Sequence, residues 1–295
     1  MQVPAALSVD FESFQHLPAY RSASGVTEQP AIGIEAIDFL LEAFEAADAT
    51  GTFFTVSNIA DDYPDVIRDV ATGHEVASHT HTHAHLSEIS ASERREELTT
   101  SRDRLADVTG ADVVGFRAPS FDVAEDHFAL LDDLGYEYDS SVVPCRSIPG
   151  WYGGEWDTRE PSPATAVDPD APAGLAEVPV AVMPGLRLPL TGTWIRFFGV
   201  RYTILGMKLL ARRGISPVLY VHPWELVDIP EVDGVPKRVY VRTGAYMRRA
   251  IERILAQPFD FVSVRSLADS VDMDRDVARR EASSAEGREG EANRR

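Results

Sequence analysis

The chain has 295 residues, of which 44% are apolar, enough for one large α/β domain or two small ones. A formal net charge of −19 repels phosphate backbones, so we expect no nucleic-acid partner. No run approaches the roughly 18 apolar residues of a membrane span. The single cysteine, Cys145, excludes an intrachain disulfide. Because the first motif also starts within ten residues of Met1, leaving no room for a signal peptide, we expect a cytoplasmic location.

The basic residues include only two lysines, Lys208 and Lys237. An acidic, lysine-poor surface indicates adaptation to a salt-rich cytoplasm, where counterions screen the self-repulsion of the surface. We therefore expect a halophilic protein.

Short apolar runs alternate along the chain with segments of helical periodicity. In chain order, the pattern predicts strands at 3–9, 52–56, 74–77, 113–116, 177–180, 218–221 and 261–264. Between them it predicts helices at 34–47, 63–72, 92–109, 126–134, 195–212 and 243–257. This alternation favours parallel βα units and an α/β fold.

Three segments depart from this pattern. Residues 145–174 are rich in Pro, Gly, Asp and Trp, which predicts a long loop over the site. Residues 274–295 are charged and poor in large apolar side chains, which predicts a disordered tail after one domain at 1–273. Residues 194–212 are apolar but carry basic residues, Arg196, Arg201 and Lys208 among them, so we expect this segment to pack on the domain. Contact with a membrane surface is the alternative.

Five of the eight histidines lie between residues 74 and 85. If this run forms a helical turn, His79 and His83 stand at i and i+4, with Cβ atoms about 5–6 Å apart. That reach suits two imidazoles on one divalent metal ion. His81 and His85 form a competing pair, which we expect to face solvent or to support the ligands, and we expect His74 to be structural. Incidental surface histidines are the remaining interpretation.

Catalytic metal sites usually add a carboxylate to such a pair. Asp10 and Glu12 end the first predicted strand and point to the same side of it. His79, Arg117 and His222 also stand where predicted strands end. The C-terminal ends of strands in an α/β barrel meet at one mouth, so these groups converge on one site.

The residues at these strand ends belong to motifs that resemble the polysaccharide deacetylase family, also called the NodB homology or carbohydrate esterase 4 family. The motifs are Ser8-Val9-Asp10-Phe11-Glu12, Thr52-Phe53-Phe54, Gly73-His74-Glu75 with His79-Thr80-His81-Thr82-His83, Gly115-Phe116-Arg117-Ala118-Pro119-Ser120, Tyr138-Asp139-Ser140-Ser141, and Leu219-Tyr220-Val221-His222-Pro223-Trp224-Glu225. The resemblance extends to about Asp269. It implies a distorted (β/α)7 barrel that removes acetyl groups from N-acetylated sugars with a divalent metal, commonly zinc.

Two motifs differ from the common family pattern. The first normally has two adjacent aspartates, a base and then a metal ligand, whereas here it resembles a subgroup with Asp-x-Glu. This implies that Glu12 joins His79 and His83 as the third ligand. A ligand role for Asp10, or a metal-free site as in allantoinase-like relatives, stays open. Ser120 replaces a tyrosine whose backbone N–H stabilises the oxyanion, a role that a serine can also fill.

The resemblance also implies a division of catalytic roles. Asp10 is expected to accept the water proton, Arg117 to hold Asp10 ionised, and His222 to protonate the leaving amine. The structural alternatives are a simple ion pair for Arg117 and a buried, hydrogen-bonded histidine for His222. Asp139 either orients His222 or caps its strand.

The expected partner is an N-acetylated glycan or its lipid- or nucleotide-linked precursor. Trp151, Tyr152 and Trp156 either stack on its sugar rings or pin their loop. The competing functions are a cyclic-amide hydrolase of the allantoinase type and a catalytically silent glycan-binding barrel. The sequence does not predict the sugar or the oligomeric state.

Overall fold

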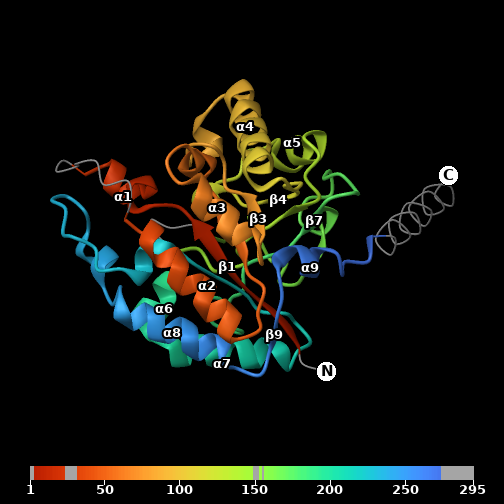
Figure 1. The fold of residues 1–295 in the computed structure, drawn as a ribbon. Helices are drawn as coiled ribbons and strands as arrows, with labels where there is room; N and C mark the ends of the chain where they lie inside the picture. Colours follow the sequence, from red (N-terminus) through yellow and green to blue (C-terminus); the bar gives the residue numbers. More distant parts are fainter. Residues whose placement is uncertain (1–2, 24–31, 149–152, 155, 274–295) are drawn as a thin grey trace, which may run out of the picture.

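The computed structural model describes residues 3–23, 32–148, 153–154 and 156–273. Within them, strands form one curled sheet with helices around it (Figure 1). The strands are β1 (Pro4–Phe11), β2 (Thr52–Thr55), β3 (Glu75–Ser78), β4 (Gly115–Phe116), β5 (Tyr138–Asp139), β6 (Ser162–Pro163), β7 (Ala176–Glu177), β8 (Val218–Val221) and β9 (Asp260–Phe261). The α-helices are α1 (Pro18–Arg21), α2 (Ile37–Ala46), α3 (Pro64–Ala71), α4 (Ala91–Thr109), α5 (His127–Asp133), α6 (Gly192–Phe198), α7 (Val200–Ala211), α8 (Ala245–Leu255) and α9 (Val264–Ala268).

The sheet order is β6-β7-β5-β4-β3-β2-β1-β8, and β9 pairs with the start of β1. All neighbours are parallel except β6 and β7. After β7, Val180 N–H donates to Val142 O at 2.9 Å, and Ala181 N–H donates to Val218 O at 2.8 Å. This segment therefore bridges the β5 side to β8 and curls the sheet. The expected α/β class with a distorted NodB-type barrel is confirmed, although several strands pair over only two residues.

The central strand β1 is buried at every residue after Pro4. A strand at this place needs its apolar character because one face packs against helices and the other against side chains of the other strands inside the curled sheet. The main core packs β1 against α2 and α8, through Leu40 and Phe44 on one helix and Ile251 and Ile254 on the other. Truncating such a residue to alanine typically costs about 2–5 kcal/mol. This packing keeps the carboxyl end of β1 in place.

Several predicted elements are wrong in detail; the strand expected at 177–180 is β7, which ends at Glu177. The helix expected at 195–212 is two helices, because Gly199 adopts φ 88° and ψ 155°. The strand expected at 261–264 ends at Phe261; Ser263 caps α9 instead, with its Oγ accepting from Ser266 N–H at 3.1 Å. The expected long loop contains β6 and the 3-10 turn Ala164–Ala166. The expected tail, together with Trp151 and Tyr152, lies outside the described residues.

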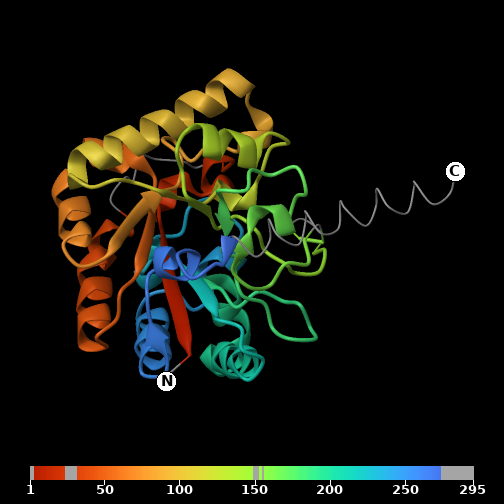
Figure 2. The same ribbon diagram turned by 90° about the vertical axis from the view of Figure 1, so that its right-hand side faces the viewer.

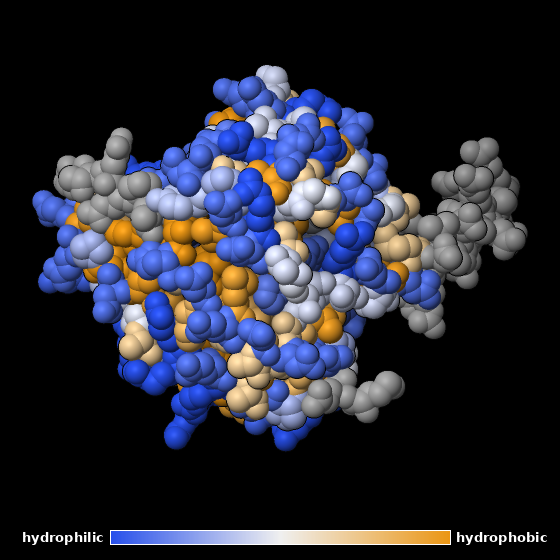
Figure 3. All heavy atoms as spheres, viewed as in Figure 1, coloured by the Kyte–Doolittle hydropathy of each residue, from blue (hydrophilic) through white to orange (hydrophobic). Residues whose placement is uncertain are grey.

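The helices form the outer layer, with the long α4 crossing one end of the sheet (Figure 2). Hydrophilic residues cover most of the face seen in Figure 3, while apolar residues gather toward its left side. Within the part of the chain that is described, no helix combines the length and the apolar character needed to cross a membrane.

Candidate active site

The predicted site residues stand at the carboxyl ends of neighbouring strands. Asp10 lies in β1 and Glu12 just beyond it, while His79 follows β3 and His222 follows β8. These four residues and His83 line one cavity of about 600 Å³. The parallel register of β3, β2, β1 and β8 brings them together, as the sequence predicts.

The histidine run is not the expected helical turn. Thr80 and His83 take left-handed backbone conformations, with φ of 64° and 60°, which non-glycine residues rarely adopt. The Glu97 carboxylate on α4 holds this turn: its Oε2 accepts from the N–H groups of His81 and Thr82, both at 2.9 Å. The two left-handed residues, rather than helical spacing, therefore bring His79 and His83 together, with ring centroids 5.1 Å apart.

Glu12, His79 and His83 form a buried set whose potential ligand atoms all lie within 4.8 Å of one another. The Nδ1–H of His79 donates to the Arg117 carbonyl at 2.7 Å. Metal-binding histidines typically have such a partner, which leaves Nε2 as the ligand atom. Burial lowers the pKa of His79 to about 4, so its ring is neutral at pH 7, as metal binding requires. The donor set therefore fits a divalent metal such as zinc.

The other histidines of the run have different partners. His81 Nδ1 lies 2.9 Å from Ser57 Oγ. His85 Nε2 lies 3.1 Å from Ser120 Oγ. His74 Nδ1 accepts from Gly51 N–H at 3.1 Å, outside the cavity. None of the three belongs to the set of potential ligands found among the described residues.

Asp10 and Arg117 form a buried ion pair. Arg117 Nη1 donates to Asp10 Oδ1 at 2.6 Å and to Ser8 Oγ at 2.9 Å. The other hydrogen bonds of Arg117 are to Ser140. The Ser140 carbonyl accepts from Nε at 3.1 Å, and the Ser140 hydroxyl accepts from Nη2 at 2.8 Å. The guanidinium also lies 4.0 Å from the centroid of the Phe54 ring. These contacts hold the Arg117 guanidinium, a permanent positive charge, in a fixed position beside Asp10.

His222 lines the cavity and is held by Glu225, not by Asp139. Its Nδ1 donates to Glu225 Oε2 at 3.3 Å, and its Nε2 lies 3.8 Å from Glu12 Oε1. Burial lowers the pKa of His222, but the hydrogen bond and charge of Glu225, with Glu12, outweigh it and raise that pKa to about 9. Of the two roles left open for Asp139, the one of orienting His222 is wrong, because Asp139 pairs with Nε2 of His127 at 3.0 Å.

Sequence reasoning missed the roles of Glu225 and Glu97. Glu225 binds Arg196 as well as His222, with Arg196 Nε donating to its Oε1 at 2.7 Å. A Cβ on Gly192 would overlap this carboxylate, so the start of α6 is fitted to Glu225. The spacing of Glu225, three residues after His222, is a capping-box signal that could have revealed it. The partners of Glu97 lie 15 and 16 residues away, so no short motif marks it.

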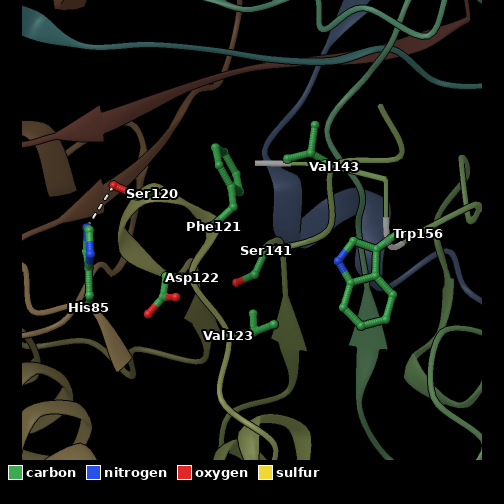
Figure 4. Close-up of a pocket in the computed structure, with 9 residues that line it drawn as sticks. His85, Ser120, Phe121, Asp122, Val123, Ser141, Val143 and Trp156 are labelled. Carbon is green, nitrogen blue, oxygen red and sulfur yellow. Dashed lines mark hydrogen bonds between the residues drawn. The ribbon is translucent and has the colours of Figure 1, made fainter. Parts of the chain in front are cut away.

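A smaller cavity of about 280 Å³ adjoins the main one (Figure 4). The two share His85, Ser120 and Phe121 as lining residues. Ser120, whose backbone N–H is expected to bind the oxyanion, has a φ of 55° and lines both cavities. Trp156 lies across the cavity from His85 in Figure 4. The predicted site thus continues beyond the catalytic groups.

Comparisons with known proteins agree with this geometry. Residues 35–138 match the family model described as Polysaccharide deacetylase, and residues 140–269 match the Domain of unknown function DUF3473. An uncharacterized 30.6 kDa protein from Geobacillus stearothermophilus is 30% identical over 99 residues. That match spans 33% of this chain and 37% of the relative.

Several solved structures share the fold. A Mycobacterium smegmatis protein described as a polysaccharide deacetylase is 23% identical to this chain. Its structure has a TM-score of 0.62, and the alignment covers 91% of this chain and 94% of the other. Another, from Pseudomonas aeruginosa PAO1, is 17% identical, with a TM-score of 0.62 and coverage of 90% and 89%. The PuuE allantoinase is 18% identical, with a TM-score of 0.61 and coverage of 90% and 89%.

The curled α/β sheet, with two carboxylates, an arginine and histidines at one mouth, defines a fold of the NodB class. Residues 35–138 therefore carry a polysaccharide deacetylase domain, and the solved structures share the fold over about nine tenths of the chain, 91% and 90%. The second half of the chain, which supplies His222 and Glu225, corresponds to the DUF3473 segment. The Asp-x-Glu subgroup stays a prediction.

Proposed function

We propose that this protein is a metal-dependent hydrolase that removes N-acetyl groups from an acetamido sugar in a polysaccharide or glycan precursor. The observation that carries the proposal is one cavity lined by two carboxylates with different partners. Asp10 is paired with Arg117, whereas Glu12 faces His79 and His83. One carboxylate is therefore suited to proton transfer and the other to a metal.

Glu12, His79 and His83 would hold the metal, for which Zn²⁺ is our proposal. When bound, such an ion polarises a carbonyl and acidifies water. The protein supplies the preorganised ligands, since Trp224 Nε1 donates to Glu12 Oε1 at 3.1 Å and the Arg117 carbonyl holds His79. Partners of this kind typically contribute about 10–100-fold to metal affinity or activity.

Asp10 is the proposed general base. An amide resists hydrolysis because its carbonyl is a weak electrophile and its amine a poor leaving group. Asp10 would accept the proton of the attacking water, and Arg117 orients its carboxylate through the contact at 2.6 Å. The backbone N–H of Ser120, at the edge of the same cavity, would donate to the developing oxyanion.

His222 is the proposed general acid for the departing amine. Glu225 fixes one edge of its ring, and the ring stacks on Trp224 with centroids 5.0 Å apart. A fixed ring can deliver its proton in a defined direction, which proton transfer requires. For both Arg117 and His222, the hydrogen bonds of the structural alternative and the proposed catalytic role are compatible.

The adjoining cavity supports a carbohydrate substrate of more than one sugar unit. Trp156 offers an aromatic face on one side of the cavity, and Asp122, Ser141 and His85 offer polar groups to the same cavity (Figure 4). Small-ligand sites commonly combine apolar surface with a few such polar groups. We propose that a neighbouring sugar of the glycan lies there while its acetamido partner lies at the catalytic groups.

A cyclic-amide hydrolase of the allantoinase type is the second candidate, since the PuuE allantoinase shares the fold. The convergence of Glu12, His79 and His83 favours the metal-dependent deacetylase over a metal-free site. A silent glycan-binding barrel would not need a buried base and acid.

A cytoplasmic location is also a proposal, based on the single cysteine; cell fractionation would test it.

The decisive experiment measures acetate release by the metal-loaded protein. Acetamido-sugar oligomers, nucleotide sugars, lipid-linked glycans and allantoin serve as substrates, and protein stripped by a chelator serves as the control. Acetate release from a glycan that is lost on stripping and restored by Zn²⁺ supports the proposal. Hydrolysis of allantoin alone contradicts it, and binding of glycan without any hydrolysis would revive the silent barrel.

A further inference from the structure

The basic charge of this acidic protein is concentrated in one segment. Residues 192–257 contain 11 basic and 5 acidic residues, a formal charge of +6, whereas the remainder contains 17 basic and 42 acidic residues, a formal charge of −25. Both lysines belong to the basic segment. It includes α6, α7 and α8, which lie together at the lower left of Figure 1.

Part of this segment is exposed, and its exposed basic and apolar residues on and beside α6, α7 and α8 are here called the docking face. It consists of Phe198, Arg201, Leu205, Lys208, Val241, Arg242 and Arg253, all exposed. Arg201, Leu205, Lys208 and Arg253 line one shallow surface cavity between α7 and α8. The loop before α8 is joined to α6 because Arg242 Nη1 donates to the Arg196 carbonyl at 3.2 Å.

The docking face is rich in exposed apolar side chains. Phe198, Leu205 and Val241 are 53%, 52% and 38% exposed, and they are three of the four large hydrophobic residues found exposed in the described part of the chain. Folding usually leaves such residues scattered singly on a surface. Here they share one surface with cationic side chains.

Within the described ranges of the chain, the basic side chains of the docking face have no carboxylate partners. Among the described residues, none of Arg201, Lys208, Arg242 and Arg253 lies within 4.0 Å of a carboxylate, judged by the ion pairs of the structure. On α3 and α4 the arrangement is the opposite, with an ion pair at each of Arg68, Arg94, Arg95, Arg102 and Arg104. The cations of the docking face are therefore available to an external anion.

We propose that the docking face binds the surface of an anionic lipid bilayer. Long basic side chains can reach lipid headgroups while apolar side chains between them enter the acyl boundary. The apolar contribution persists when high salt screens the charges. A nucleic acid fits less well, because the exposed apolar groups gain nothing from a phosphate backbone and the remaining chain repels it.

Docking would bring the catalytic cavity close to the bilayer. Phe197 lines that cavity, and its neighbour Phe198 belongs to the docking face. A lipid-linked glycan would present its sugars at this boundary. This choice of substrate class rests on the proposed function, whereas the membrane contact itself does not.

The test is flotation of the full chain with two kinds of vesicle at low and high salt. One kind is phosphatidylcholine alone, and the other mixes it with phosphatidylglycerol. We expect co-flotation with the anionic vesicles at low salt and little with the neutral ones. Each basic residue near an anionic surface strengthens such binding by about fivefold. A triple variant, Arg201→Glu, Lys208→Glu and Arg253→Glu, should therefore weaken it by that factor or more for each charge removed.

The matched control is a second triple variant, Arg68→Glu, Arg95→Glu and Arg104→Glu, which changes the net charge equally on α3 and α4. It should float as the unaltered protein does. The pair Phe198→Ser and Leu205→Ser should remove the binding that remains at high salt. Circular dichroism and unfolding midpoints verify that each variant is folded.

Several outcomes would overturn the docking proposal. These are no flotation with anionic vesicles, equal losses in the two triple variants, or preferential capture of duplex DNA over vesicles. A dimer seen by light scattering that Leu205→Glu dissociates, without lipid binding, would show instead that the face joins two copies. Activity on a soluble acetamido-sugar oligomer should be unchanged in the docking variants, so failure of docking and failure of the proposed function are distinguishable.

Discussion

Glu225 binds His222 at two points: its Oε2 accepts from the backbone N–H at 3.0 Å and from the imidazole Nδ1 at 3.3 Å. This double contact fixes the ring and leaves Nε2 on the side of the cavity, 3.8 Å from Glu12 Oε1. A strand end and the short turn Pro223–Leu226 together hold this imidazole in the orientation that the proposed proton donor needs.

Asp10→Asn and His222→Ala should each lower amide hydrolysis by about 10²–10⁴-fold, the usual contribution of acid–base groups. A carboxamide in place of the Asp10 carboxylate cannot accept the water proton, although the fold and the metal should be retained. The loss from His222→Ala should shrink for an activated ester, because its leaving group needs less protonation than an amine. Steady-state rates on both substrates, with unfolding midpoints, measure this contrast. Equal losses on amide and ester would remove His222 from the mechanism.

His79→Ala or His83→Ala should abolish stoichiometric zinc binding, because each removes one of three converging ligands. The matched variants His81→Ala and His85→Ala should retain it, since those rings contact Ser57 and Ser120 instead. Titration calorimetry with Zn²⁺ on the chelator-stripped protein gives the stoichiometry and the affinity. Similar losses in all four variants would mean that the run binds metal loosely, without a defined site.

Glu12→Ala should weaken zinc binding more than Asp10→Ala. Glu12 Oε2 lies 2.5 Å from His83 Nε2, whereas Asp10 Oδ1 is engaged by Arg117. The same calorimetric titration compares the two variants. If Asp10→Ala weakens binding more, the two carboxylates exchange roles and Asp10 becomes the third ligand.

Glu177→Gln should remove a pH-dependent loss of stability. Burial, then the charge of Asp139, raises the pKa of Glu177 well above its usual range. Between the unfolded pKa of about 4.3 and the raised folded pKa, the folded state holds one more proton, so stability falls as pH rises. The slope is at most about 1.4 kcal/mol per pH unit.

Urea unfolding at several pH values above that unfolded pKa should show a shallower slope in Glu177→Gln than in the unaltered protein. His222, whose pKa is raised to about 9, contributes equally to both proteins, so the difference between the two slopes is the measurement. The exposed Glu137→Gln is the matched control, because its carboxylate lies in a surface ion pair with Arg265. Parallel pH profiles for the unaltered protein and Glu177→Gln would show that this carboxyl group titrates normally.

The unfolding temperature should rise steeply from low to molar KCl. A formal charge of −19 causes self-repulsion in the folded state, and the Debye length falls to about 3 Å at 1 M salt. Thermal scans in KCl, with sucrose of equal osmolality as the control, separate ionic from osmotic effects. A midpoint that does not depend on KCl would contradict the proposed halophilic adaptation.

Much of the architecture follows from local patterns alone. The sequence predicts the long helix α4 to within one residue of its start, and this helix has strong local signals: Ser90 and Glu93 form a capping box, and Gly110 ends it with a φ of 70°. The strands β1, β2 and β8 are evident because buried parallel strands read as short apolar runs. The side chains at their ends can be named because parallel strands expose one common edge to the site.

Residue patterns are therefore sufficient for the α/β class and for six side chains that could act at the site. How those side chains are held depends on the folded arrangement, because their partners are distant in sequence: Arg117 reaches Asp10 across 107 positions, and Glu97 shapes the turn between His79 and His83 from α4. Local periodicity also extends the expected helix through Gly199, where the positive φ separates α6 from α7. Backbone conformations of this kind depend on what the chain packs against, which residue spacing does not encode.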